Sequence, residues 1–350
     1  MKQELNFEKE KKMMTIMLTK TKIRPFNLDD GQSVVDLFNA YSQHIYGWND
    51  ADLDDMHNDW TAPGVELKEI ARVVEDSHGN IIGYIDVYDL TEPHVIKYVW
   101  GILHPEYWDE SLYKDLLTWA EDCAQNRVSL APENARVVIN HGTPSKDKLR
   151  NAALRQYGYQ LVRNYYRMMI EFDHPPQQPV IPKGLQIVSI DLEKELKDAL
   201  IALEDGFSDH WGFVEQPIDD VLLQWEHYIQ NNKDFDPTLW FLAKDGEQIA
   251  GVCRNTDKMT EDPDMAWVSQ LCVRKPWRRK GLGMALLLTA FDEFYRRGKK
   301  RSGLGVDATS LTNATRLYEK AGMHVTQKYD TYELELRPGK DLMTKEISSS

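Results

Sequence analysis

The chain has 350 residues, of which 42% are hydrophobic and 28% are charged, a composition typical of folded globular proteins rather than disordered ones. Its formal net charge of −14 disfavours nucleic acid or an anionic membrane as the main partner and is compatible with cationic substrates. No apolar run approaches the roughly 18 residues that span a bilayer, so a membrane protein is not expected.

Residues 1–20 are rich in Lys and Glu and lack the cleavage pattern of a secretion signal, so we expect a mobile N-terminal segment and a cytoplasmic protein. The three cysteines, Cys123, Cys253 and Cys272, are scattered without metal-ligand spacing and are interpreted as reduced thiols. No metal cofactor is predicted.

Two pairs of strand-like segments lie on either side of the Pro-rich tract 173–183, which is interpreted as an extended linker. Each pair predicts a β-hairpin: 71–75 and 81–87 before the tract, 239–244 and 247–254 after it. In both halves the hairpin is followed by a strand, a Pro-containing loop, an amphipathic helix, another strand and a short helix that ends at a glycine. The segment that begins at Asn151 parallels the one that begins at Asn313, so duplication of one α+β unit is predicted.

The most informative segment is 265–295 in the second half. Val268 to Val273 predicts a strand, and Met284, Leu287, Leu288, Phe291 and Tyr295 follow helical spacing. Between them lie Arg278, Arg279, Lys280, Gly281, Leu282 and Gly283. The two glycines permit a tight turn whose N–H groups meet a ligand at the positive end of the helix, which favours a phosphate site. A solvated basic turn that caps a helix is the alternative for a lone Gly-x-Gly.

This loop resembles the Arg/Gln-x-x-Gly-x-Gly/Ala motif of the GNAT acetyltransferase superfamily. Its lead-in Leu271-Cys272-Val273-Arg274-Lys275-Pro276 and the later segment from Asn313 to Met323 resemble further features of that family. The resemblance implies an α+β fold of two tandem GNAT-like domains, each a mixed, mainly antiparallel sheet flanked by helices. The expected ranges are 21–172 and 184–337, joined by 173–183 and followed by a mobile tail, 338–350. The tandem arrangement is similar to that of mycothiol synthase relatives.

The resemblance also implies acetyl-CoA as co-substrate. The amides from Arg279 to Met284, with the cation of Arg278, are expected to bind its pyrophosphate. The strand edge at Leu271, Cys272 and Val273 is expected to pair with the pantetheine arm, which Asn313 also contacts. The expected partner is a small-molecule amine, and the expected activity is N-acetyl transfer.

Acetyl transfer to an amine requires removal of a proton from the nucleophile and its delivery to the departing thiolate. Tyr318 is the predicted acid, with helix packing as its alternative role. No carboxylate occurs between Trp267 and Gln270, so the general base is left open between water relayed by Ser269 or Gln270 and the imidazole of His210. A structural role beside Trp211 is the alternative for His210.

In the first half, His104 to Tyr113 occupies the place of the phosphate loop. Both glycines are missing there, two carboxylates stand where the second half has Lys280 and Gly281, and Leu154 replaces Tyr318. Carboxylates repel a pyrophosphate, so the first domain is predicted to keep the fold and to have lost CoA binding.

Other functions remain as alternatives. The same fold can use a longer acyl-CoA or an acceptor that is not an amine, or can bind acyl-CoA as a non-catalytic sensor. A dinucleotide-binding oxidoreductase is disfavoured because Leu286 replaces the third glycine of its motif. A second basic cluster, Arg296, Arg297, Lys299, Lys300 and Arg301, indicates a solvated helix end, a contact to the CoA 3′-phosphate or, less well, nucleic acid.

Overall fold

The computed structural model describes residues 21–90, 92–310 and 313–345. The predicted mobile segment 1–20 and the last residues of the predicted tail, 346–350, lie outside the described residues. The described strands are β1 (Lys22–Pro25), β2 (Ala71–Glu75), β3 (Ile81–Tyr88), β4 (Ile96–Leu103), β5 (Val137–Pro144), β6 (Gln160–Glu171), β7 (Gln186–Ser189), β8 (Trp240–Asp245), β9 (Gln248–Thr256), β10 (Met265–Val273), β11 (Arg301–Asp307) and β12 (His324–Arg337). The helices are α2 (Gly31–Tyr46), α3 (Leu53–Trp60), α4 (Leu67–Ile70), α5 (Glu110–Asn126), α6 (Lys148–Gln156), α7 (Leu192–Phe207), α8 (Ile218–Asn231), α9 (Leu282–Arg296) and α10 (Ala314–Lys320).

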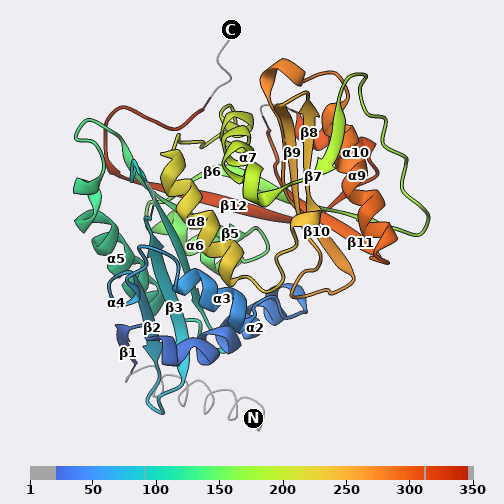
Figure 1. The fold of residues 1–350 in the computed structure, drawn as a ribbon. Helices are drawn as coiled ribbons and strands as arrows, with labels where there is room; N and C mark the ends of the chain where they lie inside the picture. Colours follow the sequence, from blue (N-terminus) through green and yellow to red (C-terminus); the bar gives the residue numbers. More distant parts are fainter. Residues whose placement is uncertain (1–20, 91, 311–312, 346–350) are drawn as a thin grey trace.

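All of these strands form one sheet, in the order β1-β2-β3-β4-β5-β12-β6-β11-β10-β9-β8-β7. The two halves therefore mirror each other, but the last strand of each half lies in the other half's sheet. β6 pairs antiparallel with β11, β12 pairs antiparallel with β5, and the two exchanged strands pair with each other in the middle. In Figure 1, β12 crosses the centre of the molecule in red between the two groups of strands.

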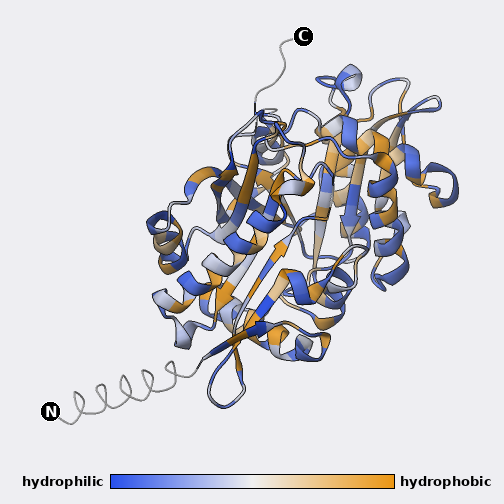
Figure 2. Cartoon of the chain, turned by 90° about the vertical axis from the view of Figure 1, so that its left-hand side faces the viewer, coloured by the Kyte–Doolittle hydropathy of each residue, from blue (hydrophilic) through white to orange (hydrophobic). Residues whose placement is uncertain are grey.

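The predicted hairpins are confirmed: β2 pairs antiparallel with β3, and β8 with β9. Alternation of side chains along the strands divides the core into layers on the two faces of the sheet. In the second half, Trp240 and Leu242 pack under α7, whereas Phe241 and Ala243 pack under α9. In the first half α2 and α3 cover one face and α5 covers the other. Figure 2 shows hydrophobic colour along the strands and polar colour on the outer sides of the helices.

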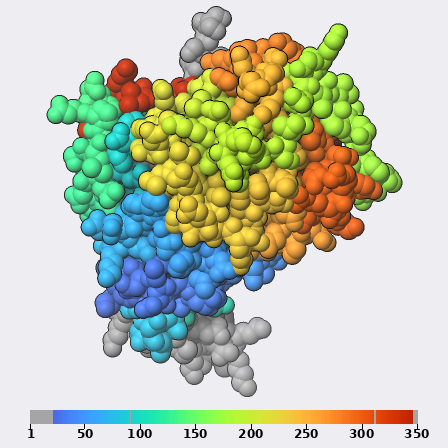
Figure 3. All heavy atoms as spheres, viewed as in Figure 1, coloured from blue at the N-terminus to red at the C-terminus, as the bar shows by residue number. Residues whose placement is uncertain are grey.

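The two halves also meet through their helices. Gln224 and His227 on α8 approach the carbonyl oxygens of Pro63 and Asn58 at 3.3 Å each. Figure 3 shows this contact as the yellow surface of the second half lying on the blue surface of the first. Residues 173–183, the predicted linker, contain no helix or strand.

The described part of the C-terminal tail is held by the fold. The backbone of Lys340 exchanges hydrogen bonds with Asn134 and Arg136 of the first half, at 2.7 and 2.8 Å. Thr344 pairs through its backbone with Gly212 and Phe213 of the second half, at 2.8 and 2.9 Å. Residues 338–345 therefore connect both halves, in contrast to the mobile tail expected from their polarity.

Candidate active site

The central strands of the second half separate where the site begins. β10 and β11 pair in parallel from Met265 and Arg301 to Val268 and Leu304, and a β-bulge follows between Val268 and Gln270. Both strands continue beyond this point, so the edge of β10 at residues 269–273 has no strand partner on the β11 side within the part of the chain that the structure describes. Free backbone groups at such an edge can bind an extended ligand.

The predicted phosphate loop leads from this strand into α9. Gly281 has a φ of +86° and is the N-cap of the helix, and Arg279 has a φ of +63°. The first N–H groups of α9 have no partner inside the helix and point toward the loop, where the helix dipole favours an anion. A β-carbon on Gly283 would meet the side chain of Leu317 at 3.2 Å, which explains why a small residue follows the turn.

A groove of about 510 Å³ runs past this loop and is strongly cationic. Its lining includes Arg278, Arg279, Arg316 and Lys320 and no carboxylate. In a chain with a net charge of −14, this concentration of cations favours an anionic ligand. The predicted cofactor residues that line the groove are Leu271, Cys272, Val273, Arg278, Arg279, Gly281, Leu282, Gly283, Met284 and Asn313.

Two cations of the loop have intramolecular partners. Arg278 donates to the carbonyl oxygens of Val273 at 2.7 Å and Gly206 at 3.0 Å and forms an ion pair with Asp209. Burial opposes ionisation of Asp209, but the bonds and charge of Arg278 lower its pKa below the ordinary value. Lys280 donates to the carbonyl oxygen of Pro276 at 2.9 Å and is not part of the groove lining. Arg278 thus ties the loop to the end of α7, and Arg279 is exposed toward the groove.

A second cavity of about 230 Å³ meets the groove, and Tyr318, His210, Leu271 and Ala314 line both. Tyr318 is 8% exposed and its hydroxyl makes no hydrogen bond with any residue that the structure describes. Burial raises the pKa of Tyr318, so the hydroxyl keeps its proton at neutral pH. The predicted acid, Tyr318, and one candidate base, His210, therefore lie where the groove and the second cavity meet.

The candidates for the base differ in their surroundings. Burial lowers the pKa of His210 below 6.5, against the opposing charge of Asp209, so its imidazole is neutral at pH 7 and can accept a proton. Its ring lies 4.5 Å from that of Phe207. Ser269 and Gln270 also line the second cavity, but the amide oxygen of Gln270 already accepts from Arg254 at 3.1 Å.

Sequence reasoning missed two residues of the second cavity. Tyr165 comes from β6 of the first half, and only the strand exchange brings it to this site. Asp307, at the end of β11, lines the cavity and pairs with Arg163 at 2.6 Å. Asp307 is the last residue of a strand that pairs in parallel with β10, and residues at the carboxyl ends of parallel strands often line ligand sites, so this position could have been predicted from the sequence.

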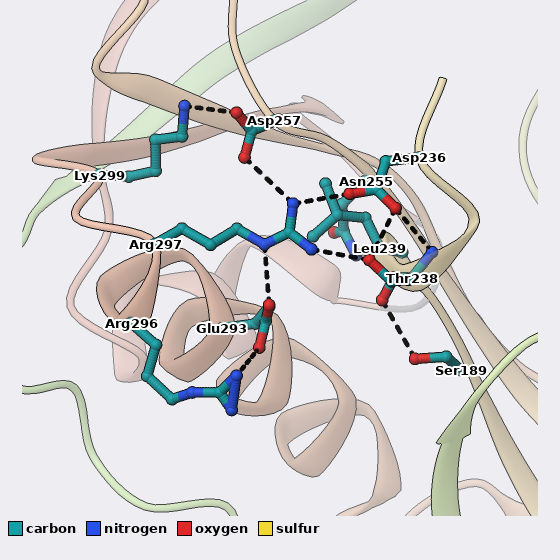
Figure 4. Close-up of polar contacts among 10 residues, drawn as sticks. All are labelled: Ser189, Asp236, Thr238, Leu239, Asn255, Asp257, Glu293, Arg296, Arg297 and Lys299. Carbon is teal, nitrogen blue, oxygen red and sulfur yellow. Dashed lines mark hydrogen bonds and ion pairs between the residues drawn. The ribbon is translucent and has the colours of Figure 1, made fainter. Parts of the chain in front are cut away.

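Four of the five cations in the second basic cluster pair with neighbouring carboxylates, and Figure 4 shows the pairs of Arg296, Arg297 and Lys299. Arg297 pairs with Glu293, Asp236 and Asp257, at 2.8, 2.7 and 3.4 Å. Arg296 and Lys299 pair with Glu293 and Asp257, and Arg301 pairs with Asp262. These pairs hold the end of α9 against β8 and β9, which corresponds to the structural interpretation of the cluster.

The first half has a different structure at the equivalent place. β4 pairs with β3 without the bulge that β10 carries. Tyr107 and Trp108 fold onto the core beside Tyr113, with 5.1 Å between the ring centroids of Trp108 and Tyr113. Leu154, the counterpart of Tyr318, is fully buried.

Comparisons with known proteins agree with this geometry. Residues 200–323 match the model of the acetyltransferase (GNAT) family. The chain is 30% identical to a GCN5-related N-acetyltransferase from Sphaerobacter thermophilus, covering 92% of this chain and 97% of that one with a TM-score of 0.75. This chain belongs to the GNAT family.

Two more distant structures share the fold of this GNAT protein. A tandem GNAT protein from the clavulanic acid biosynthesis pathway has 14% identity and a TM-score of 0.66, with 92% of this chain and 100% of that one covered. Saccharomyces cerevisiae N-myristoyltransferase with bound myristoyl-CoA has 8% identity and a TM-score of 0.59, covering 90% and 78%. No curated protein matches the sequence significantly.

The predicted α+β fold of two tandem GNAT-like units is thereby confirmed, and the protein is an acyl-CoA-dependent acyltransferase by family. Among the described residues, no group of three or more His, Cys, Asp or Glu side chains is arranged to hold a metal ion. No helix in the described ranges is long and apolar enough to cross a membrane.

Proposed function

We propose that this GNAT protein transfers the acetyl group of acetyl-CoA to a primary amine of a small molecule. One observation carries the proposal: a groove lined by four cations and no carboxylate meets a smaller cavity at Tyr318 and His210. A polyanionic co-substrate in the groove and an acceptor in the cavity would then meet between a proton donor and a proton acceptor.

The cationic lining of the groove supports binding of the CoA moiety. The amides from Arg279 to Met284, at the start of α9, would bind the pyrophosphate, with Arg279 and Arg316 adding charge. The unpaired edge of β10 would hold the pantetheine arm in the manner of an added strand, with Asn313 on the opposite side. Arg278 would act by fixing the loop, since its own donors are engaged.

The proton transfers would be divided between two side chains. An aliphatic amine with a pKa of about 10.4 is almost wholly protonated at pH 7, which costs roughly 4 to 5 kcal/mol unless the site accepts the proton. His210, neutral in its buried position, would accept it directly or through water held by Ser269. A backbone N–H of residues 269–273 would stabilise the negative charge on the carbonyl oxygen. As the C–S bond breaks, Tyr318 would protonate the departing thiolate and would regain a proton from the nitrogen, which loses its second proton as the amide forms.

We also propose that the two halves have different roles. We propose residues 21–172 as a GNAT-like unit without a CoA site, 173–183 as linker and 184–337 as the active unit. The half-buried Trp108 and the fully buried Leu154 support a structural role for the first unit, and Tyr165 gives that unit a share in the lining of the acceptor cavity.

Free-thiol release from acyl-CoA in the presence of a panel of primary amines tests the proposal. Amine-dependent release with an acetylated product by mass spectrometry would support it. Release with butanoyl- or myristoyl-CoA only would assign a longer acyl donor. Tight CoA binding with no amine-dependent release from any donor would refute catalysis and favour a sensor.

A further inference from the structure

The first half contains a cavity of about 540 Å³ that the reaction so far does not use. It lies on the face of β3, β4 and β5 that faces away from α5. Three cross-strand pairs place its residues in a row: Asp86 opposite Trp100, Tyr88 opposite Tyr98, and Tyr98 opposite Asn140. Tyr165 and Trp211 line both this cavity and the acceptor cavity. The two spaces are therefore neighbours with a shared wall.

The charge of this cavity is opposite to that of the CoA groove. Asp86 is its one carboxylate, and no Lys, Arg or His is among the residues that line it. The remaining wall is aromatic to an unusual degree, with Tyr88, Tyr98, Trp100, Tyr165 and Trp211. A carboxylate surrounded by aromatic rings is the arrangement by which proteins bind organic ammonium groups, through ion pairing and cation–π attraction.

Three of the lining residues carry polar atoms without a partner. Asp86 Oδ1, Asn140 Oδ1 and Trp100 Nε1 are buried and make no hydrogen bond with any residue that the structure describes. Asp86 is only 7% exposed and Asn140 8%. A buried polar atom without a hydrogen bond destabilises the fold, so three such atoms among the residues that line one cavity indicate a ligand or ordered water. Two of the three are acceptors, which an ammonium group satisfies, and the indole N–H can donate to an oxygen of the same ligand.

The charges around Asp86 are compatible with a cation. Tyr84 donates its hydroxyl to Asp86 Oδ2 at 2.9 Å, and Asp59 on α3 adds a second negative charge nearby. Burial raises the pKa of Asp86 to about 7, which a bound cation would lower again. Arg150 lies behind the Trp100 ring at 5.3 Å, but Asp147 and the Tyr41 hydroxyl offset its charge.

Trp211, like Trp100, already has cationic neighbours within the protein. Arg163 and Lys345 lie over the Trp211 ring at 5.2 and 4.9 Å, so this ring is not free on every side. Arg163 is paired with Asp307, and Lys345 with Glu333 and Asp341. The attraction for a ligand cation therefore comes from Asp86 with Tyr88 and Tyr98, while Trp100 and Trp211 form the apolar part of the wall.

We propose that this cavity binds a second, protonated amine of the acceptor, so that the substrate is an elongated molecule with at least two amines. One amine enters the acceptor cavity beside Tyr318, and the remote ammonium lies against Asp86 past Tyr165 and Trp211. This inference rests on the proposed function for the role of the ligand as acceptor, but the ammonium site itself rests on the geometry of the first half.

The test is calorimetric titration of the full chain, without acetyl-CoA, with straight-chain α,ω-diamines from diaminobutane to diaminooctane. Each diamine is compared with the monoamine of the same length. At least one diamine should bind about ten-fold or more tighter than its monoamine. Asp86→Asn should abolish this preference, and Asn140→Asp, which adds a carboxylate to the same wall, should increase it. Asp219→Asn, at an exposed position on α8, removes the same charge elsewhere and should change nothing.

Equal binding of diamines and monoamines, or a preference that survives Asp86→Asn, would overturn the proposal and leave the cavity to ordered water. Asn140→Asp keeps the test decisive if Asp86→Asn fails to fold, because an unchanged preference in that variant contradicts the site. Thiol release with the same amines is measured separately. Diamine binding that depends on Asp86 without any thiol release would contradict the proposed function and leave the ammonium site standing.

Discussion

Replacing Tyr318 by Phe isolates the proposed proton donor. The ring is 8% exposed and packs in the core of the second half with α9 and α10, and Phe retains this packing. The hydroxyl has no hydrogen-bond partner among the described residues, so its removal leaves no buried group unsatisfied. We therefore expect a change of less than about 1 kcal/mol in the free energy of unfolding.

The expected effect on the reaction is much larger. Loss of a general acid slows a reaction by typically 10² to 10⁴-fold, which corresponds to about 3 to 5 kcal/mol in the activation barrier. Because the substitution removes one neutral hydroxyl and leaves the cations of the groove in place, acetyl-CoA affinity should remain within about two-fold of that of the unmodified protein. The loss should therefore appear in kcat.

The assay is free-thiol release at saturating acetyl-CoA with the amine that reacts fastest in the panel. Tyr295→Phe is the matched control, since Tyr295 lies on α9 of the same half, contacts the Phe172 ring edge to face and is not among the lining residues of either cavity. A Tyr318→Phe variant with kcat within three-fold of the control, and with unchanged stability, would refute the assignment of Tyr318 as acid.

Three further variants probe other parts of the account. Asp86→Asn should be more stable than the unmodified protein at pH 8 and equal to it near pH 4, because the carboxyl titrates near 3.8 when unfolded and near 7 when folded. This difference corresponds to on the order of 4 kcal/mol, and parallel urea unfolding profiles at the two pH values would contradict it. Gly206→Ala should destabilise the fold by about 1 to 3 kcal/mol, because the added β-carbon would meet Cys272 Sγ at 2.5 Å. The control is Gly305→Ala, whose added β-carbon would meet no atom within 4 Å, so its thermal unfolding temperature should not change. His210→Gln should lower kcat/KM by about 10² to 10⁴-fold. With kcat/KM calculated for the unprotonated amine, the unmodified enzyme should lose activity below pH 6.5 as His210 becomes protonated, because burial lowers the pKa of His210, and the variant should lack this loss. A variant whose activity still falls in this range would exclude His210 as the base.

Local patterns in the sequence predicted the parts of the fold that depend on local physics. The turn at Gly281, the start of α9 at Leu282 and the two hairpins follow from glycine conformation, hydrophobic period and turn residues within short windows. The position of Tyr318 at the groove followed from the motif order, and the structure places it there. Its catalytic role stays a prediction.

The features that the sequence did not predict depend on contacts between distant segments. No local pattern shows that β6 and β12 exchange sheets, since either strand has the same alternation in both positions. That exchange brings Tyr165 to the acceptor cavity. The polar segment 338–345 lacks periodicity, yet backbone hydrogen bonds through Lys340 and Thr344 anchor it. The motif predicts Arg278 as a phosphate ligand, but Arg278 forms an ion pair with Asp209, which follows the end of α7.

Titration of the protein with acetyl-CoA tests the central claim most directly. The unmodified chain should bind close to one molecule, because the groove of the second half has the cations and the first half does not have the loop. Arg279→Glu with Arg316→Glu should weaken binding by about 100-fold or more, since both charges line the groove. The control Lys183→Glu with Lys300→Glu reverses two exposed charges that are not among the lining residues of the groove and should leave binding unchanged. Binding of two molecules, or equal affinity in the two double variants, would contradict the account.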